Sequence, residues 1–155
     1  MKKFVALGLV VSTLAVGAPA FAQDADAGAT VFKRCAACHA VGEGAKNKVG
    51  PELNELFGRV AGGLADYKYS KAMIEAGQAG LVWTPETVAP YLHKPKEAVP
   101  GTKMSFPGLP NDKDVGNLIA YLATFSPNYV PADAAAPAEA APADAAPAEA
   151  APAAQ

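Results

Sequence analysis

The amino-acid sequence predicts an all-α domain with long connecting loops. Apolar residues recur three and four positions apart in several segments, which is the spacing of an amphipathic helix. No sustained alternation of β-branched or aromatic residues with polar ones appears, so strands are not expected. Between residues 23 and 130 the chain holds 12 glycines and 8 prolines, which predict short helices separated by loops.

The chain of 155 residues divides into three segments by composition. Residues 1–22 begin with a basic end, continue as a short apolar stretch and finish at Ala20-Phe21-Ala22. This pattern predicts a signal peptide cleaved after Ala22, with an uncleaved anchor as the alternative. Residues 131–155 hold only alanine, proline, acidic residues and one glutamine, a composition typical of a disordered tail. Residues 23–130 are therefore expected to be the working domain, in an oxidising compartment such as the periplasm.

The charge and cysteine content of residues 23–130 exclude several classes of protein. This segment carries 11 basic and 11 acidic side chains, whereas a nucleic-acid-binding domain normally has a basic excess, so no nucleic-acid partner is expected. No apolar run after residue 22 approaches the roughly 20 residues of a membrane span, so stable membrane insertion is not expected. The two cysteines exclude a disulfide-rich scaffold, because they allow at most one bridge.

The first predicted helix begins at Asp24 or Asp26, because either side chain is suited to accept hydrogen bonds from the first turn. Its apolar residues keep helical spacing as far as Cys35. A second, short helix is predicted over residues 70–76. A serine at its start is a typical cap, and Gly77 is typical of the position that follows a helix.

The third predicted helix begins at Thr84-Pro85-Glu86, which combines a cap residue, a proline at the first position and an acid in the first turn. Pro90 is expected to distort this helix or to make it restart. The last predicted helix begins after Asn111 and ends at Pro127. Its apolar stripe consists of Val115, Leu118, Ile119, Leu122 and Phe125.

Two long loops, Gly42–Gly50 and Ala98–Pro110, connect the predicted helices. Loops of this length are uncommon in a small domain unless they serve a function. We therefore expect that something other than their own side chains organises them.

The sequence Cys35-Ala36-Ala37-Cys38-His39 predicts covalent attachment of one haem c through its two cysteines. The spacing suits this chemistry, because two thiols must reach the two vinyl groups of one ring while the next residue places an imidazole under the iron. A redox-active Cys-x-x-Cys pair would need a strand–helix context that the sequence lacks. A zinc site would need two more ligands, of which only His93 is a strong candidate, and a structural disulfide would not need the histidine.

Three residues are candidates for the second axial position of the iron. Met73 falls at a core position of the helix predicted over residues 70–76, and His93 stands in a polar stretch typical of a surface histidine. Met104 lies in a loop where proline and glycine residues keep the backbone out of a helix, which can aim one side chain inward. A thioether is a soft ligand, and Met/His ligation raises the haem potential. We therefore predict His39 and Met104 as the iron ligands, and electron transfer as the function.

These motifs belong to an ordered set that covers residues 27–124. The set consists of Gly28…Phe32, Cys35-Ala36-Ala37-Cys38-His39, Gly50-Pro51…Leu53…Leu56-Phe57-Gly58-Arg59, Tyr67-Lys68-Tyr69-Ser70, Trp83, Tyr91-Leu92-His93-Lys94-Pro95, Pro100-Gly101-Thr102-Lys103-Met104 and Leu118-Ile119-Ala120-Tyr121-Leu122. In this order the sequence resembles the class I cytochromes c, close to the small bacterial cytochromes c2 and the mitochondrial cytochromes c. The resemblance implies the class I cytochrome c fold, in which the N- and C-terminal helices cross and long loops wrap around one covalently bound haem.

The resemblance also implies roles for residues near the histidine ligand and the haem propionates. The Pro51 carbonyl would accept the ring N–H of His39, which would make the imidazole a better donor. Tyr69 and Trp83 would hydrogen-bond one buried propionate, and Arg59 would lie nearby to offset its charge.

On the opposite side of the haem, Tyr91 and Thr102 would lie near the sulfur of Met104 and tune it. Phe106 would cover the haem edge. The sequence departs from the family pattern at Ala98, where an aromatic residue is common, and in three extra residues between the tyrosine motif and the tryptophan. Neither departure touches a predicted iron ligand.

The resemblance implies an electron carrier and not an enzyme. It implies a soluble periplasmic monomer that shuttles single electrons between membrane respiratory or photosynthetic complexes. A quinol–cytochrome c oxidoreductase is the expected donor, and a terminal oxidase or reaction centre the expected acceptor. The alternatives are a haem enzyme or ligand binder with an openable distal position, such as a peroxidase, and a haem subunit of a larger assembly. Docking is expected at a lysine-rich haem edge formed by Lys33, Arg34, Lys46, Lys48, Lys94, Lys96 and Lys103.

Overall fold

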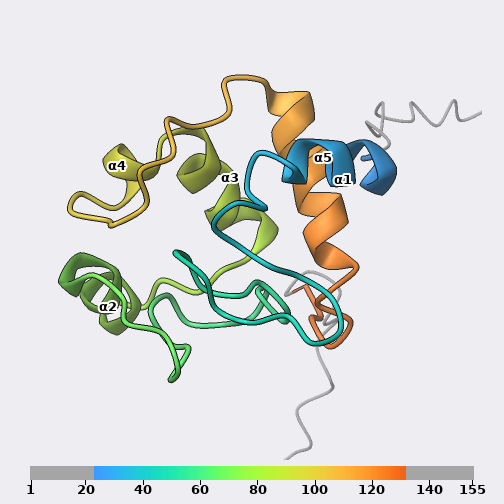
Figure 1. The fold of residues 1–155 in the computed structure, drawn as a ribbon. Coiled ribbons are helices and arrows are strands. Elements are labelled where there is room, and N and C mark those ends of the chain that lie inside the picture. The colour runs from blue at the N-terminus through green and yellow to red at the C-terminus, as the bar shows by residue number, and fades with distance from the viewer. Residues whose placement is uncertain (1–22, 132–155) are drawn as a thin grey trace, which may run out of the picture.

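A computed structural model describes residues 23–131 as an all-α arrangement (Figure 1). No strand occurs in this part of the chain, where the one extended pairing is an isolated antiparallel bridge between Val60 and Val82. The prediction of an all-α domain with long loops is therefore confirmed. The helices are α1 (Ala25–Phe32), α2 (Lys71–Gln78), α3 (Pro85–His93), α4 (Pro95–Ala98) and α5 (Asp112–Ala123).

The four longer helices begin where the sequence predicts, because each has a side chain that accepts from its first turn. The carboxylate of Asp24 accepts from the backbone N–H of Asp26 at 2.8 Å and of Ala27 at 3.0 Å. Ser70 and Asn111 cap α2 and α5 in the same way. At the start of α3 the cap is a reciprocal pair formed by the residues at 84 and 87.

The ends of the first two helices differ from the prediction. Helix α1 ends at Phe32 and not at Cys35, and the chain continues as a series of turns over residues 33–38. Gly77 does not end α2. It is buried inside the helix, and the residue with the left-handed backbone conformation that ends it is Gly80, whose φ is +97°.

Two further helices also differ from what the sequence leads us to expect. Of the two effects expected of Pro90, a restart does not occur, because helix α3 runs on to His93. The short α4 that follows was not predicted. Helix α5 ends at Ala123, four residues before Pro127. The hydroxyl of Thr124 donates to the Tyr121 carbonyl at 2.7 Å and so satisfies one of the terminal carbonyl groups of α5.

The first and last helices cross at one end of the molecule, and α3 packs against both α4 and α5 (Figure 1). Gly28 permits the crossing, because a Cβ at this position would overlap the Asn117 carbonyl of α5 and lie 2.7 Å from Cβ of Tyr121. Helix α2 lies on the other side of the molecule (Figure 1). The buried core of the described residues consists of Phe32, Leu56, Phe57, Ala61, Met73, Trp83, Val88, Leu92, Val99, Leu109, Val115, Leu118, Ile119 and Leu122.

His93 is not the plain surface histidine that its polar surroundings in the sequence indicate. Its side chain is half-buried, and its Nδ1 lies 2.6 Å from the carbonyl oxygen of Leu109. Its Nε2 lies 3.1 Å from Oδ1 of Asp112. The ring thus links the end of α3 to the loop before α5 and to the first residue of α5, and it is not among the residues that line the cavity described below.

Within residues 23–131 no helix is long and apolar enough to cross a membrane. The predicted signal peptide over residues 1–22 lies outside the described residues. So does the predicted tail, apart from its first residue, Pro131.

Candidate functional site

A cavity of about 420 Å³ lies between the turns that follow α1, the loop over residues 49–59 and the loop over residues 102–107. Its walls are mostly apolar and include the core residues Leu56, Leu92 and Leu118. The eleven residues predicted to attach, ligate or contact the haem all line this one cavity. They are Cys35, Cys38, His39, Pro51, Arg59, Tyr69, Trp83, Tyr91, Thr102, Met104 and Phe106.

His39 is held in position by the turns after α1. Its backbone N–H donates to the Cys35 carbonyl at 2.9 Å, and Gly50 N–H donates to the Cys38 carbonyl at 2.8 Å. Its Nδ1 lies 2.7 Å from the Pro51 carbonyl oxygen, and because a carbonyl only accepts, Nδ1 carries the proton. The Nε2 lone pair is then available to the cavity as a ligand.

The electrostatic surroundings of His39 keep its imidazole neutral. Burial lowers the pKa of His39, and the positive charges of Arg59 and Lys48 lower it further against the opposing effect of the Pro51 hydrogen bond. A metal ligand must be deprotonated at the coordinating nitrogen, so this environment favours coordination.

Gly50 makes room for the His39 ring. A Cβ at residue 50 would lie 2.7 Å from Nε2 of His39, which is closer than such atoms approach in proteins. The glycine that precedes Pro51 is therefore required for the His39 ring to take this position.

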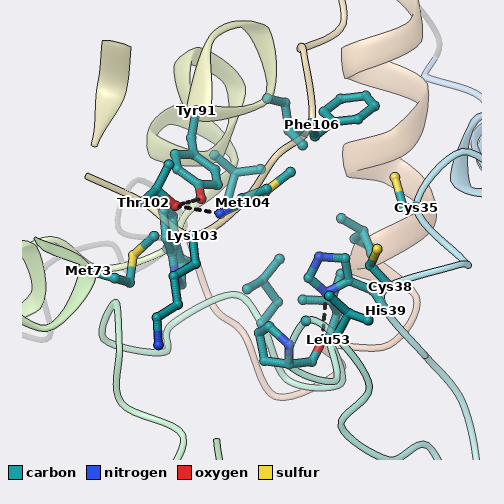
Figure 2. A pocket seen from close by; sticks show the side chains of 18 of the residues that line it. Cys35, Cys38, His39, Leu53, Met73, Tyr91, Thr102, Lys103, Met104 and Phe106 are labelled. Carbon is teal, nitrogen blue, oxygen red and sulfur yellow. Dashed lines mark hydrogen bonds between the residues drawn. The ribbon is translucent and has the colours of Figure 1, made fainter. Parts of the chain in front are cut away.

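The two cysteines lie beside His39 on the same side of the cavity (Figure 2). Neither thiol is in a disulfide. Burial raises the pKa of Cys35, and the nearby Arg34 charge opposes that shift. Two free thiols and an imidazole around one apolar cavity fit a haem attached through thioether bonds.

Met104 lies on the opposite side of the cavity from His39 (Figure 2). Its loop is held by Thr102, whose hydroxyl oxygen accepts from the Met104 backbone N–H at 3.3 Å. The same hydroxyl lies 2.9 Å from the Tyr91 hydroxyl, which comes from α3. Met73 also lines the cavity, but it is a buried core residue of α2, as its helical position predicts.

The three residues expected near the propionates also lie in the wall of the cavity, with one unexpected partner. Trp83 is buried and its ring centroid lies 5.0 Å from that of Tyr91, whereas Tyr69 is half-buried. The Arg59 guanidinium is paired with Glu52, whose carboxylate oxygen lies 3.1 Å from Nη1. The sequence analysis missed this partner, because a pairing within an irregular loop follows no periodic spacing.

The comparisons with known proteins agree with this geometry. The family model described as cytochrome c matches residues 25–126. The chain belongs to the cytochrome c family. Cytochrome c2 of Afifella marina is 55% identical over 105 residues, which cover 68% of this chain and 85% of the relative. Cytochrome c2 of Agrobacterium tumefaciens is 54% identical over 110 residues, which cover 71% of this chain and 98% of the relative.

Solved structures of the cytochrome c family are similar to the fold as well. The structure of cytochrome c2 from Rhodospirillum centenum has a TM-score of 0.63 and 41% sequence identity, and the match covers 67% of this chain and 99% of that chain. Cytochrome cH from Methylobacterium extorquens has a TM-score of 0.59 and 43% identity, with 65% and 98% covered. The class I cytochrome c fold that the motifs imply is confirmed.

Membership of the cytochrome c family decides two further questions. The protein is an electron-transfer protein and not an enzyme, since the relatives are cytochromes c2. The family also implies a covalently attached c-type haem, and Cys35 and Cys38 are the two cysteines of the chain. The neutral imidazole, the free thiols and the apolar walls of the cavity fit that group.

Proposed function

We propose that the protein carries single electrons in the periplasm through one haem c whose iron is ligated by His39 and Met104. One observation supports this most strongly. The His39 ring and the Met104 side chain lie on opposite sides of one apolar cavity whose wall also holds both free thiols (Figure 2). A haem held by Cys35, Cys38, His39 and Met104 would supply a one-electron couple, and with both His39 and Met104 bound to the iron it would offer no open site to a substrate.

The polar residues of the cavity wall stabilise this state. The Pro51 carbonyl fixes the tautomer of His39 and increases the basicity of its other nitrogen. Thr102 and Tyr91 hold the Met104 loop by their hydrogen bonds.

Tyr69, Trp83 and Arg59 serve as the propionate partners in this proposal. The paired Arg59 and Glu52 side chains are only 14% and 16% exposed, so the guanidinium reaches the propionate region with part of its charge already balanced.

The remaining expectations complete the proposal. Residues 1–22 are a signal peptide cleaved after Ala22, residues 23–130 are the haem domain and residues 131–155 are a tail. The mature protein works as a monomer that accepts electrons from a quinol–cytochrome c oxidoreductase and passes them to a terminal oxidase or reaction centre.

Partners dock at the basic edge of the cavity. Arg34 and Lys103 line the cavity and are exposed, and Phe106 lines it as well. The Arg34 guanidinium lies 5.6 Å from the centroid of the Phe106 ring. An acidic partner that meets this edge would approach close to the haem, which favours rapid electron transfer.

The ligand proposal is tested by the visible spectrum of the oxidised holoprotein and of two matched variants. Met104→Leu and Met73→Leu each replace a cavity methionine with a residue of similar volume. We expect the sulfur–iron charge-transfer absorption at the red end of the spectrum in the wild type and in Met73→Leu, and its loss with a high-spin ferric spectrum in Met104→Leu. Loss of the band in Met73→Leu alone would contradict the assignment, and a high-spin wild type would favour the ligand-binding alternative.

A further inference from the structure

The peptide group that joins Pro51 to Glu52 is hydrogen-bonded at both of its polar atoms. Its carbonyl oxygen lies 2.7 Å from Nδ1 of His39. Its N–H, which belongs to Glu52, donates to Oδ1 of Asn47 at 2.8 Å. The side chain of Asn47 and the ring of His39 are therefore the two ends of one hydrogen-bonded chain that passes through a single amide.

Asn47 is fixed in the orientation that this chain requires. Its Nδ2 donates to the Asp66 carbonyl at 3.0 Å. Because that carbonyl only accepts, Oδ1 is the atom that faces the Glu52 N–H. The Asn47 side chain thus bridges two loops and presents an acceptor to the peptide.

The next peptide group is held from the other side. Nη2 of Arg59 donates to the Glu52 carbonyl at 3.0 Å, while Nη1 pairs with the Glu52 carboxylate at 3.1 Å. With Glu52 anchored at its carbonyl and at its side chain, the Pro51–Glu52 amide has little freedom to turn toward a different partner.

We propose that Asn47 is a positioning residue that tunes the iron ligand His39 through the Pro51–Glu52 peptide. An amide whose N–H is bonded becomes a stronger acceptor at its carbonyl, because hydrogen bonds in a chain polarise one another. A stronger acceptor at Pro51 draws on the Nδ1 proton and makes Nε2 a better electron donor. A better donor stabilises the ferric state relative to the ferrous state, so Asn47 lowers the reduction potential. This inference depends on the proposed ligation by His39.

The test uses the mature holoprotein and the variant Asn47→Leu, which removes the acceptor and keeps the branched shape of the side chain. We expect its reduction potential to rise, because the loss of one bond from a hydrogen-bonded chain should change the one-electron equilibrium constant roughly twofold. A tenfold change in that constant corresponds to 59 mV, so the expected rise is about 18 mV. We also expect the His39 Nδ1 proton of the ferrous protein to move upfield in the NMR spectrum, since its hydrogen bond weakens.

Two further variants separate this effect from simple loosening of the loop. Asn54→Leu is the matched control, because Asn54 is also a half-buried bridging side chain, bonded to Gly42 N–H at 2.8 Å and to the Gly42 carbonyl at 2.9 Å. It should leave the potential and the Nδ1 proton unchanged. Asn47→Asp keeps the acceptor but loses the donor to Asp66, and its potential should be equal to or below that of the wild type.

Three results would contradict the proposed role of Asn47. An unchanged potential and Nδ1 shift in Asn47→Leu, an equal rise in Asn54→Leu, or a rise in Asn47→Asp that matches Asn47→Leu would each overturn the inference. If Asn47→Leu does not accumulate as holoprotein, Asn47→Ala removes the same acceptor and replaces it in the test. A wild type without the sulfur–iron band would instead defeat the proposed ligation, so the two failures are distinguishable.

Discussion

Among single residues, Tyr91 connects the helical core to the loop that carries Met104. Its hydroxyl bonds Thr102, which in turn accepts from the Met104 backbone. Burial raises the pKa of Tyr91, although the hydrogen bond to Thr102 opposes that shift. The neutral phenol is therefore part of the folded structure, and its loss of a proton should be coupled to unfolding.

We predict that Tyr91→Phe changes the stability of the holoprotein in a pH-dependent way. Because the folded-state pKa lies above the unfolded value of about 10, the stabilisation is complete below pH 10 and is lost as the pH rises through the folded-state pKa. Urea unfolding of the wild type should show this loss, and Tyr91→Phe should show a shallower one. At pH 8 the variant should be less stable by about 1 kcal/mol, because Thr102 loses its partner. Equal slopes above pH 10 would contradict the prediction.

Some residues of the site could be identified from the sequence, and others could not, because only some of their roles require one particular residue type. The cysteines and His39 could be selected from the sequence, since thioether attachment and axial ligation each require one residue type at one spacing. Asn47 and Glu52 could not be selected in this way. Many polar side chains could form their hydrogen bonds, and only the path of the loop brings them to the Pro51 peptide and to Arg59.

At the scale of the helices, beginnings were predictable and ends were not. A start is marked by a local signal such as Ser70, whose side chain satisfies its own helix. An end depends on packing. Gly77 is a residue type that often follows a helix, yet it lies buried within α2. A glycine is needed there because a Cβ would overlap the Ala61 carbonyl. The left-handed conformation after the helix is adopted by Gly80 instead. The sequence supplies two glycines and does not show which one faces a neighbour.

Close contact between α1 and α5 leads to a prediction about their crossing. Gly28→Ala should lower the free energy of unfolding by about 1–3 kcal/mol, because its Cβ would collide with the Asn117 carbonyl and force the helices apart. The measurement is urea unfolding of the holoprotein followed by far-UV circular dichroism. Gly116→Ala on α5 is the control, since its Cβ would only reach the Gln23 side chain at an ordinary 3.6 Å.

For Gly116→Ala we expect no loss of stability. Replacement of glycine by alanine inside a helix is usually stabilising by about 0.5–1 kcal/mol when space allows. Equal destabilisation of both variants would contradict the prediction, because it would show that the close contact at Gly28 is not the cause of the loss.

The whole molecule is arranged around a cavity built more from loops than from helices. Its wall takes residues from the turns after α1, the 49–59 loop, α2, α3, the 102–107 loop and α5. The sequence analysis identified the long loops and the need for something to organise them, but their paths follow from hydrogen bonds across large sequence distances. One example is Lys103, whose Nζ donates to the carbonyl oxygens of Lys68 and Tyr69 across the mouth of the cavity. No local pattern encodes such contacts.

Charge must therefore be considered over the whole surface of the domain. The seven basic residues proposed for docking are all exposed, but their charges are not equally free. Lys94 pairs with Glu97 at 3.1 Å, whereas Lys103 bonds only neutral carbonyl groups at the mouth of the cavity. A neutral domain can still steer a partner if its unpaired positive charge lies on one edge.

We predict that electron transfer from a purified quinol–cytochrome c oxidoreductase slows as ionic strength rises. The second-order rate should fall by about tenfold or more between low and high salt, because screening shortens the range of the attraction. Lys103→Gln should lower the rate at low salt and flatten its salt dependence. Lys113→Gln removes the same charge from the first turn of α5, outside the cavity wall, and should leave both nearly unchanged. Rates that do not vary with salt, or equal effects of the two variants, would show that docking does not depend on this edge.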